Sequence, residues 1–133
     1  MRRANRYRRG SAPQNGPGLR LFRTATLVWV MVIAWFAFRP SFGPDGGLPW
    51  DKANHALAFV VLTSLTGRGW PGLSRTVLIL IMLAAGVGIE FVQGLPQIGR
   101  DADVWDVVAD AVGVAGGLAL LAWLARLRNP VRE

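Results

Sequence analysis

The sequence predicts an all-α membrane protein, a four-helix transmembrane bundle with a disordered basic N-terminal tail. Of its 133 residues, 52% are hydrophobic and only 17% are charged, a balance typical of membrane proteins. The apolar residues also fall in long runs, at 24–38, 77–89 and 111–125, separated by short polar segments. Runs of this length match the thickness of a bilayer. The chain has no cysteine, which excludes disulfides, thiol nucleophiles and cysteine-based metal sites.

The N-terminal tail, residues 1–19, is rich in Arg, Gly, Pro, Ser and Asn. Such a composition buries too little apolar surface to offset the entropy of ordering, so we expect it to be disordered. Its arginines precede an apolar helix, and we interpret them as a topology signal attracted to anionic lipid and not as a nucleic-acid site. The apolar run is too long for a signal peptide and lacks an A-x-A cleavage signal, which indicates a retained first helix.

Turn-forming residues divide a single membrane domain, residues 20–126, into four predicted spans. The first covers 20–38 and stops before Pro40, because proline disfavours helix in the preceding residue. The second covers 51–66, with Asp51 as its N-cap. The third covers 74–97 and contains Pro96 near its end. The fourth covers 103–126, and a basic tail, 127–133, follows it.

The charges of the loops predict the orientation. Basic residues occupy the N-terminal tail, the second loop (Arg68 and Arg75) and the C-terminal tail, whereas the first and third loops hold nearly all the acids. The positive-inside rule therefore places both termini in the cytoplasm and the acidic loops outside.

Three groups of polar residues fall on the acidic side of the predicted bundle. At 1.5 Å per residue, one member of each group lies roughly 6 to 10 Å inside its helix end. Spacings of three and four place each of three sets on one helix face: Asp51 with His55, Glu90 with Gln93, and Asp103 with Asp106 and Asp110. Glycines at 86, 113 and 117 continue two of these faces and favour close helix packing. The groups are Asp51, Lys52 and His55 in the second span, Glu90 and Gln93 in the third, and Arg100, Asp103, Asp106 and Asp110 leading into the fourth.

Some of these residues have a purely structural interpretation. Asp103 and Asp51 are N-cap candidates, and Lys52 can extend toward the headgroups. His55, Glu90 and Asp110 lie deeper, where an ionisable group is costly unless it is paired or hydrated. Glu90 can pair with Arg100 or His55 and so hold two helices together, or it can take part in chemistry. The sequence leaves both roles open.

A metal site built from His55 with Glu90, Asp106 or Asp110 is chemically feasible. One imidazole with carboxylates suits Zn or Mn, whereas Mg would use the acids alone. A single histidine is a weak signal for a metal. We therefore expect no metal and no cofactor from the sequence.

Together these residues resemble the VanZ-like family of bacterial membrane proteins, named for an accessory protein in teicoplanin resistance. The resemblance rests on Asp51-Lys52-x-x-His55-x-x-x-Phe59, on Glu90-x-x-Gln93, and on Arg100-x-x-Asp103-x-x-Asp106 followed by Gly113 and Gly117. It covers about 51–117 and is specific only in combination. Asp110 departs from the family, where this position is usually Asn. The resemblance implies a multi-pass protein of the bacterial cytoplasmic membrane that acts at the cell envelope.

The preferred hypothesis is an outward-facing polar pocket that engages a lipid-linked or cell-wall-related ligand and affects glycopeptide susceptibility. The expected partners are the bilayer and a lipid-linked envelope precursor, with no nucleic acid. In an enzymatic version, Glu90 or Asp106 acts as general acid or base, His55 shuttles protons and Arg100 holds an anionic group. The sequence leaves open whether a reaction is catalysed, and it does not give the oligomeric state.

Two alternatives stand beside this hypothesis. One is a non-enzymatic binding module whose polar residues lock the helices together. The other is a small transporter, which would have to oligomerise because four spans without internal repeats make a small alternating-access unit.

Overall fold

The computed structural model describes residues 16–38, 49–98 and 102–128, with side chains from residue 52 onward in the second segment. These residues form four helices and no strand: α1 (Pro17–Phe38), α2 (Pro49–Gly69), α3 (Arg75–Gln93) and α4 (Val104–Arg128). The predicted all-α, four-helix class is therefore confirmed. The predicted disordered tail lies mostly outside the described residues, as do residues 129–133.

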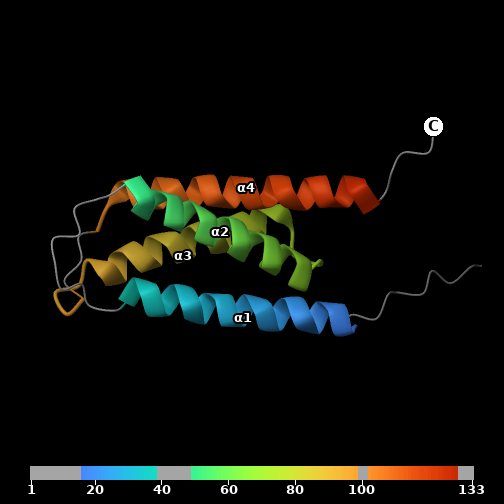
Figure 1. The fold of residues 1–133 in the computed structure, drawn as a ribbon, viewed down its shortest axis with the longest axis horizontal. Coiled ribbons are helices and arrows are strands. Elements are labelled where there is room, and N and C mark those ends of the chain that lie inside the picture. Colours follow the sequence, from blue (N-terminus) through green and yellow to red (C-terminus); the bar gives the residue numbers. More distant parts are fainter. Residues whose placement is uncertain (1–15, 39–48, 99–101, 129–133) are drawn as a thin grey trace, which may run out of the picture.

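The four helices lie side by side along one long axis, and successive helices run in opposite directions (Figure 1). α1 and α4 lie on opposite sides of this bundle, with α2 and α3 between them. α2 packs most extensively on α4 and next on α1, while α3 packs mainly on α4. Because α2 and α4 share the largest interface, residues on their facing sides are the ones that the fold brings together.

Three of the described helices, α1, α3 and α4, are long and apolar enough to cross a membrane. Their lengths of 22, 19 and 25 residues match the roughly 20 residues that a bilayer core requires. Large apolar side chains on them face outward, including Met31, Trp35 and Phe91, each at least 70% exposed. Lipid is the solvent that such a surface fits. α2 has 21 residues and is less apolar, and two of its polar side chains turn toward α4.

The helix ends differ from the predicted ones in informative ways. α3 ends at Gln93 and not at 97, because the N–H of Gly94 is the last to bond four residues back, to the carbonyl of Glu90, whereas the N–H of Leu95 bonds the carbonyl of Val92 and begins a turn. Pro96 therefore lies beyond the helix and breaks no hydrogen bond within it, which corrects the predicted boundary.

α2 begins at Pro49 and ends at Gly69, three residues past the predicted end, so Asp51 lies inside the helix and is not its N-cap as predicted. α1 begins at Pro17, where proline is well tolerated in a first helical turn, so residues 17–19 of the predicted disordered tail are helical.

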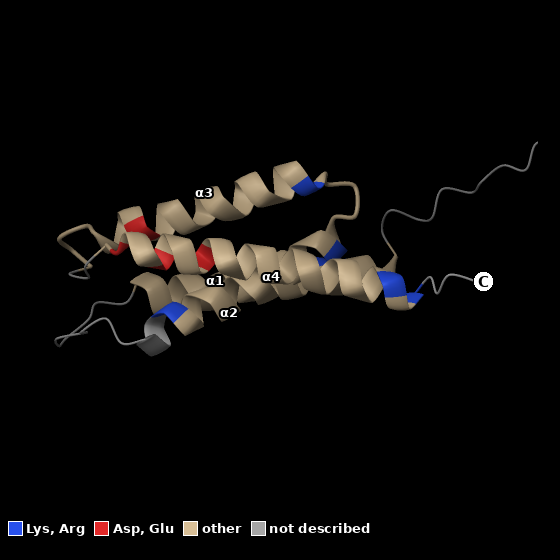
Figure 2. Cartoon of the chain, turned by 90° about the horizontal axis from the view of Figure 1, so that it is seen from above, with Lys and Arg blue, Asp and Glu red and all other residues tan. Residues whose placement is uncertain are grey.

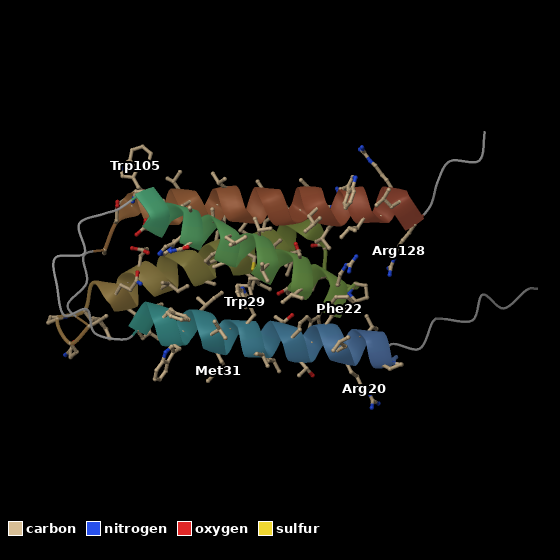
Figure 3. All side chains as sticks on the ribbon, viewed as in Figure 1. Arg20, Phe22, Trp29, Met31, Trp105 and Arg128 are labelled. Atoms are coloured by element: carbon tan, nitrogen blue, oxygen red, sulfur yellow. The ribbon has the colours of Figure 1, made fainter. Side chains whose placement is uncertain are left out.

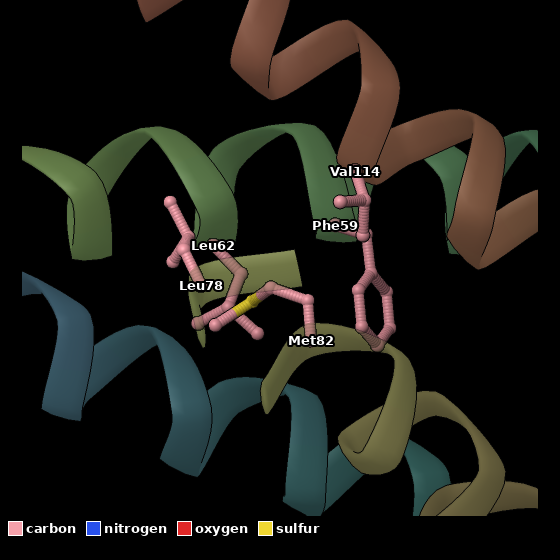
Figure 4. Packing of buried hydrophobic residues seen from close by; sticks show 5 residues of the cluster. All are labelled: Phe59, Leu62, Leu78, Met82 and Val114. Carbon is pink, nitrogen blue, oxygen red and sulfur yellow. The ribbon is translucent and has the colours of Figure 1, made fainter. Parts of the chain in front are cut away.

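The apolar core occupies the middle of the bundle. It joins α2, α3 and α4 through Phe59, Leu62, Leu78, Met82 and Val114 (Figure 4). Each of these side chains is at most 5% exposed.

Beside this core, α4 contacts α2 through glycines. A Cβ at Gly113 would lie 2.3 Å from the carbonyl oxygen of Ala56, and one at Gly117 would lie 2.6 Å from Cβ of Thr63. No side chain fits in such spaces, so the two backbones approach each other closely. This close approach fixes α4 on α2 and sets the register of the polar residues one turn away.

Candidate functional site

The charged residues separate toward the two ends of the bundle (Figure 2). At the end where α1 starts and α4 finishes, which we call the basic end, lie Arg20, Arg23, Arg68, Arg75, Arg126 and Arg128. The opposite end, here the acidic end, holds all four described carboxylates and a single lysine. The candidate site is the cluster of these residues: Lys52, His55, Glu90, Asp103, Asp106 and Asp110.

The basic end is held together by arginine contacts between α1 and α2. Arg23 donates from Nε to the carbonyl of Gly69 at 2.9 Å, and its guanidinium lies 5.5 Å from the ring centre of Trp70. Arg68 lies 5.1 Å from the ring centre of Phe22. Arginines that rest on aromatic rings near a helix end suit a membrane interface.

Lys52 of α2 bridges two carboxylates at the start of α4. Its Nζ lies 2.5 Å from Oδ2 of Asp103 and 3.0 Å from Oδ1 of Asp106. Asp103 also accepts the N–H of Trp105 at 2.9 Å, which is the predicted N-cap of the fourth helix. The hydrogen bond from Lys52, followed by that from Trp105, holds the pKa of Asp103 below its ordinary value.

His55 lies one turn deeper and faces two carboxylates of α4. Its Nδ1 is 3.0 Å from Oδ1 of Asp110, a hydrogen-bonding distance. Its Nε2 is 3.9 Å from Oδ2 of Asp106, which is too long for a hydrogen bond. Asp110 is only 1% exposed, so α4 presents a fully buried carboxylate to the imidazole.

Glu90 brings α3 into the cluster. Its Oε2 accepts the N–H of Asp103 at 2.9 Å, whereas its Oε1 is buried and has no hydrogen-bond partner among the described residues. Oδ2 of Asp110 is in the same situation. A Cβ at Gly86 would lie 2.7 Å from this oxygen, so the glycine one turn below Glu90 makes room for Asp110. Two buried carboxylate oxygens thus lack a donor within the cluster.

The structure brings together most of the predicted site residues. Gln93 is the exception among the described side chains, because its Nε2 donates to the carbonyl of Ala37 at 3.2 Å and ties α3 to the end of α1. The side chains of Asp51 and Arg100 lie outside those described. The predicted pairing of Glu90 with Arg100 therefore stays a prediction.

An apolar groove beside the cluster is absent from the sequence-based prediction. It has a volume of about 480 Å³ and runs between α1, α2 and α3. Trp29 of α1 points toward the neighbouring helices (Figure 3) and donates from Nε1 to the carbonyl of Ala58 at 3.0 Å. Two polar residues, Asn54 and His55, belong to the lining; the others are Trp29, Val32, Ile33, Phe36, Ala37, Leu57, Ala58, Phe59 and Ile89.

No periodicity in the sequence marks this groove, since it depends on the distance between helices α1 and α2. Its position has one chemical consequence. His55 lines the groove and also belongs to the charged cluster, so an apolar chain in the groove would end beside ionisable groups.

Comparison of the chain with protein-family models, with curated proteins and with solved structures gives no match.

Proposed function

We propose that this chain is a VanZ-like protein of the bacterial cytoplasmic membrane that binds a lipid-linked, cell-wall-related ligand at its acidic end. In this proposal the basic end faces the cytoplasm and the acidic end faces outward, in line with the positive-inside rule. The groove receives the lipid chain, and the charged cluster receives the headgroup. The observation that carries the proposal is that His55 belongs to both.

The lining of the groove supports a lipid chain as its occupant. Nine of the eleven lining residues are apolar, and they come from α1, α2 and α3. The volume of about 480 Å³ falls within the range of pockets that hold small ligands. In a membrane such a groove fills with hydrocarbon, because water would gain no hydrogen bonds there. A prenyl or acyl chain is therefore the chemistry that it fits.

The composition of the cluster supports a headgroup rich in hydroxyl and amide groups. Oε1 of Glu90 and Oδ2 of Asp110 are acceptors with no donor among the described residues. A buried acceptor without a donor is costly, and a sugar hydroxyl or a peptide amide would relieve that cost. Carbohydrate and peptide groups are what a lipid-linked wall precursor carries.

The same geometry supports proton transfer as the chemical version of this function. Asp110 contacts Nδ1 of His55 and would orient the imidazole ring for proton transfer with a ligand. Asp106, with its Oδ2 3.9 Å from Nε2 of the same ring, would be the second group at the reacting position. Binding of the ligand and its chemical turnover can be measured separately. Loss of His55 would reduce turnover of the ligand more than its binding.

Native mass spectrometry of the purified protein with a polyprenyl lipid that carries a sugar–peptide headgroup and with phosphatidylglycerol tests the proposal. Val32→Trp fills the groove from α1, and Val28→Trp places the same side chain one turn away at a 57% exposed position outside the lining. We expect wild type and Val28→Trp to retain the polyprenyl lipid preferentially and Val32→Trp to lose it. Equal retention of both lipids by all three proteins would contradict the proposal.

The effect on the envelope is tested in cells with the same pair of variants. If the groove serves a wall precursor, Val32→Trp changes glycopeptide susceptibility to the same extent as deletion of the protein, while Val28→Trp behaves as wild type. A deletion strain with unchanged susceptibility to teicoplanin would remove the link to glycopeptides and leave lipid binding to be judged by mass spectrometry.

A further inference from the structure

We propose that His55, Glu90 and Asp106 bind a divalent transition-metal ion, with Zn²⁺ as the best fit. The inference rests on the geometry of these side chains and does not depend on the proposed lipid ligand. Each residue comes from a different helix, respectively α2, α3 and α4. The ion would therefore lie where three helices of the bundle meet.

The three side chains offer ligand atoms at a suitable spacing. One nitrogen or oxygen from each residue lies within 4.8 Å of the other two. In a four-coordinate Zn²⁺ site, bond lengths of about 2.0–2.2 Å separate the ligand atoms by about 3.3 Å. Side-chain rotations would bring the atoms to that spacing. Three protein ligands leave a fourth position for water or a substrate, as in catalytic zinc sites.

The roles of the individual atoms agree with this assignment. Oδ1 of Asp106 is held by Lys52, and its Oδ2 faces Nε2 of His55 at 3.9 Å. At that distance the two atoms are not bonded to each other but can share an ion. Asp106 thereby has one oxygen for positioning and one for coordination.

Asp110 occupies the place of an outer-shell partner. A histidine that ligates a metal almost always donates its other ring N–H to a carboxylate or carbonyl, which fixes its tautomer and orientation. Nδ1 of His55 lies 3.0 Å from Oδ1 of Asp110, which is 1% exposed. The pair leaves Nε2 facing Asp106 and the ion.

A separate observation at Glu90 also favours a cation ligand. Glu90 is 94% buried, since it is 6% exposed, and its Oε1 has no partner among the described residues. A carboxylate oxygen in that environment needs a proton or a cation. The described cluster holds four carboxylates against one lysine and one histidine, so its charge favours a cation.

Titration of the purified protein with Zn²⁺ alone, by calorimetry in detergent and without any histidine tag, tests the proposal. Asp106→Asn and Asp103→Asn are matched, because both remove a carboxylate that binds Lys52 and asparagine at 103 still caps the helix. We expect one tight site in wild type, a loss of at least ~100-fold in affinity for Asp106→Asn, and little change for Asp103→Asn. Asp110→Asn should cost about 10–100-fold, as outer-shell substitutions do.

Three results would overturn the site. The first is that folded wild type does not bind Zn²⁺. The second is that Asp103→Asn and Asp106→Asn lose Zn²⁺ affinity equally, which would indicate diffuse attraction to an acidic patch. The third is that His55→Ala keeps the full Zn²⁺ affinity of wild type. Thermal unfolding without metal shows whether each variant is folded.

If Asp106→Asn fails to fold, the visible absorption of Co²⁺ bound to wild type decides instead. A spectrum with nitrogen and oxygen ligands in a four- or five-coordinate site supports the proposal, and that of the hexa-aqua ion contradicts it. Because no lipid is present, failure here leaves the lipid proposal intact.

Discussion

One face of α4 contacts α2 in two different ways along its length. At the acidic end Asp106 and Asp110 meet Lys52 and His55 through ion pairs and hydrogen bonds. One turn further along the same face, Gly113 admits the α2 backbone so closely that a Cβ would lie 2.3 Å from a carbonyl oxygen. The polar contacts hold the helices together through side chains that can rearrange, whereas the glycine contacts hold backbone against backbone. Stability should therefore depend mainly on the glycines, and binding on the acids.

The largest expected effect is on the glycine side of this comparison. In Gly113→Ala the new methyl group would clash with the carbonyl of Ala56 and with Cβ of Phe59, and neither group can rotate away. Overpacking of this kind costs typically about 1–3 kcal/mol, so we expect a clear fall in the melting temperature of the purified protein in detergent.

Gly88→Ala is the matched control, since a Cβ at this α3 position meets nothing within 4 Å. Alanine favours helix over glycine by up to about 1 kcal/mol, so this variant should melt at or above the wild-type temperature. If both glycine variants melted alike, the close approach of α2 and α4 would not be what sets stability.

A smaller effect is expected on the polar side, from the buried pair of His55 and Asp110. A double-mutant cycle with alanine at both positions should give a coupling energy of about 1 kcal/mol, in the range of interhelical hydrogen bonds in membranes. The matched cycle pairs Asp110 with Asn54, an exposed neighbour of His55 on α2. Its coupling should be within about 0.3–0.5 kcal/mol of zero, and equal couplings in the two cycles would contradict a specific pair.

The smallest effect is expected at the exposed edge of the cluster. Lys52 lowers the pKa of Asp103, so the ionised carboxylate stabilises the folded state above the unfolded pKa of about 3.9 and loses this effect as the pH falls through the folded pKa. The melting temperature of wild type should therefore exceed that of Asp103→Asn slightly at pH 5–7. The difference should vanish in more acidic buffer, and a difference that does not change with pH would exclude the ion pair as its cause.

The polar cluster was predictable because helical spacing and depth are properties of the sequence. His55, Glu90 and Asp110 lie three or four residues from other polar positions, and the positions of turn residues gave their approximate depths. The spacing and approximate depth of these residues change little when a predicted helix end is wrong by a few residues. The meeting of α2, α3 and α4 at one level followed from them.

Details that depend on distances between helices were not predictable. Gln93 has the same spacing from Glu90 as a site residue would have, yet it binds the carbonyl of Ala37 on α1. α3 ends at Gln93, where a turn between Val92 and Leu95 replaces the helix, three residues before Pro96. The groove arises from the separation of α1 and α2, for which no pattern of residue types provides a measure.

Glu90→Gln tests most directly whether the polar cluster is a working site or a structural lock. Glutamine retains an oxygen that can accept the N–H of Asp103 and differs from glutamate mainly in charge. If the cluster is a site, the melting temperature in detergent changes by no more than about 2 °C, while retention of the polyprenyl lipid and the effect on glycopeptide susceptibility are lost. Collapse of the melting temperature would contradict this account and make the cluster a lock between helices.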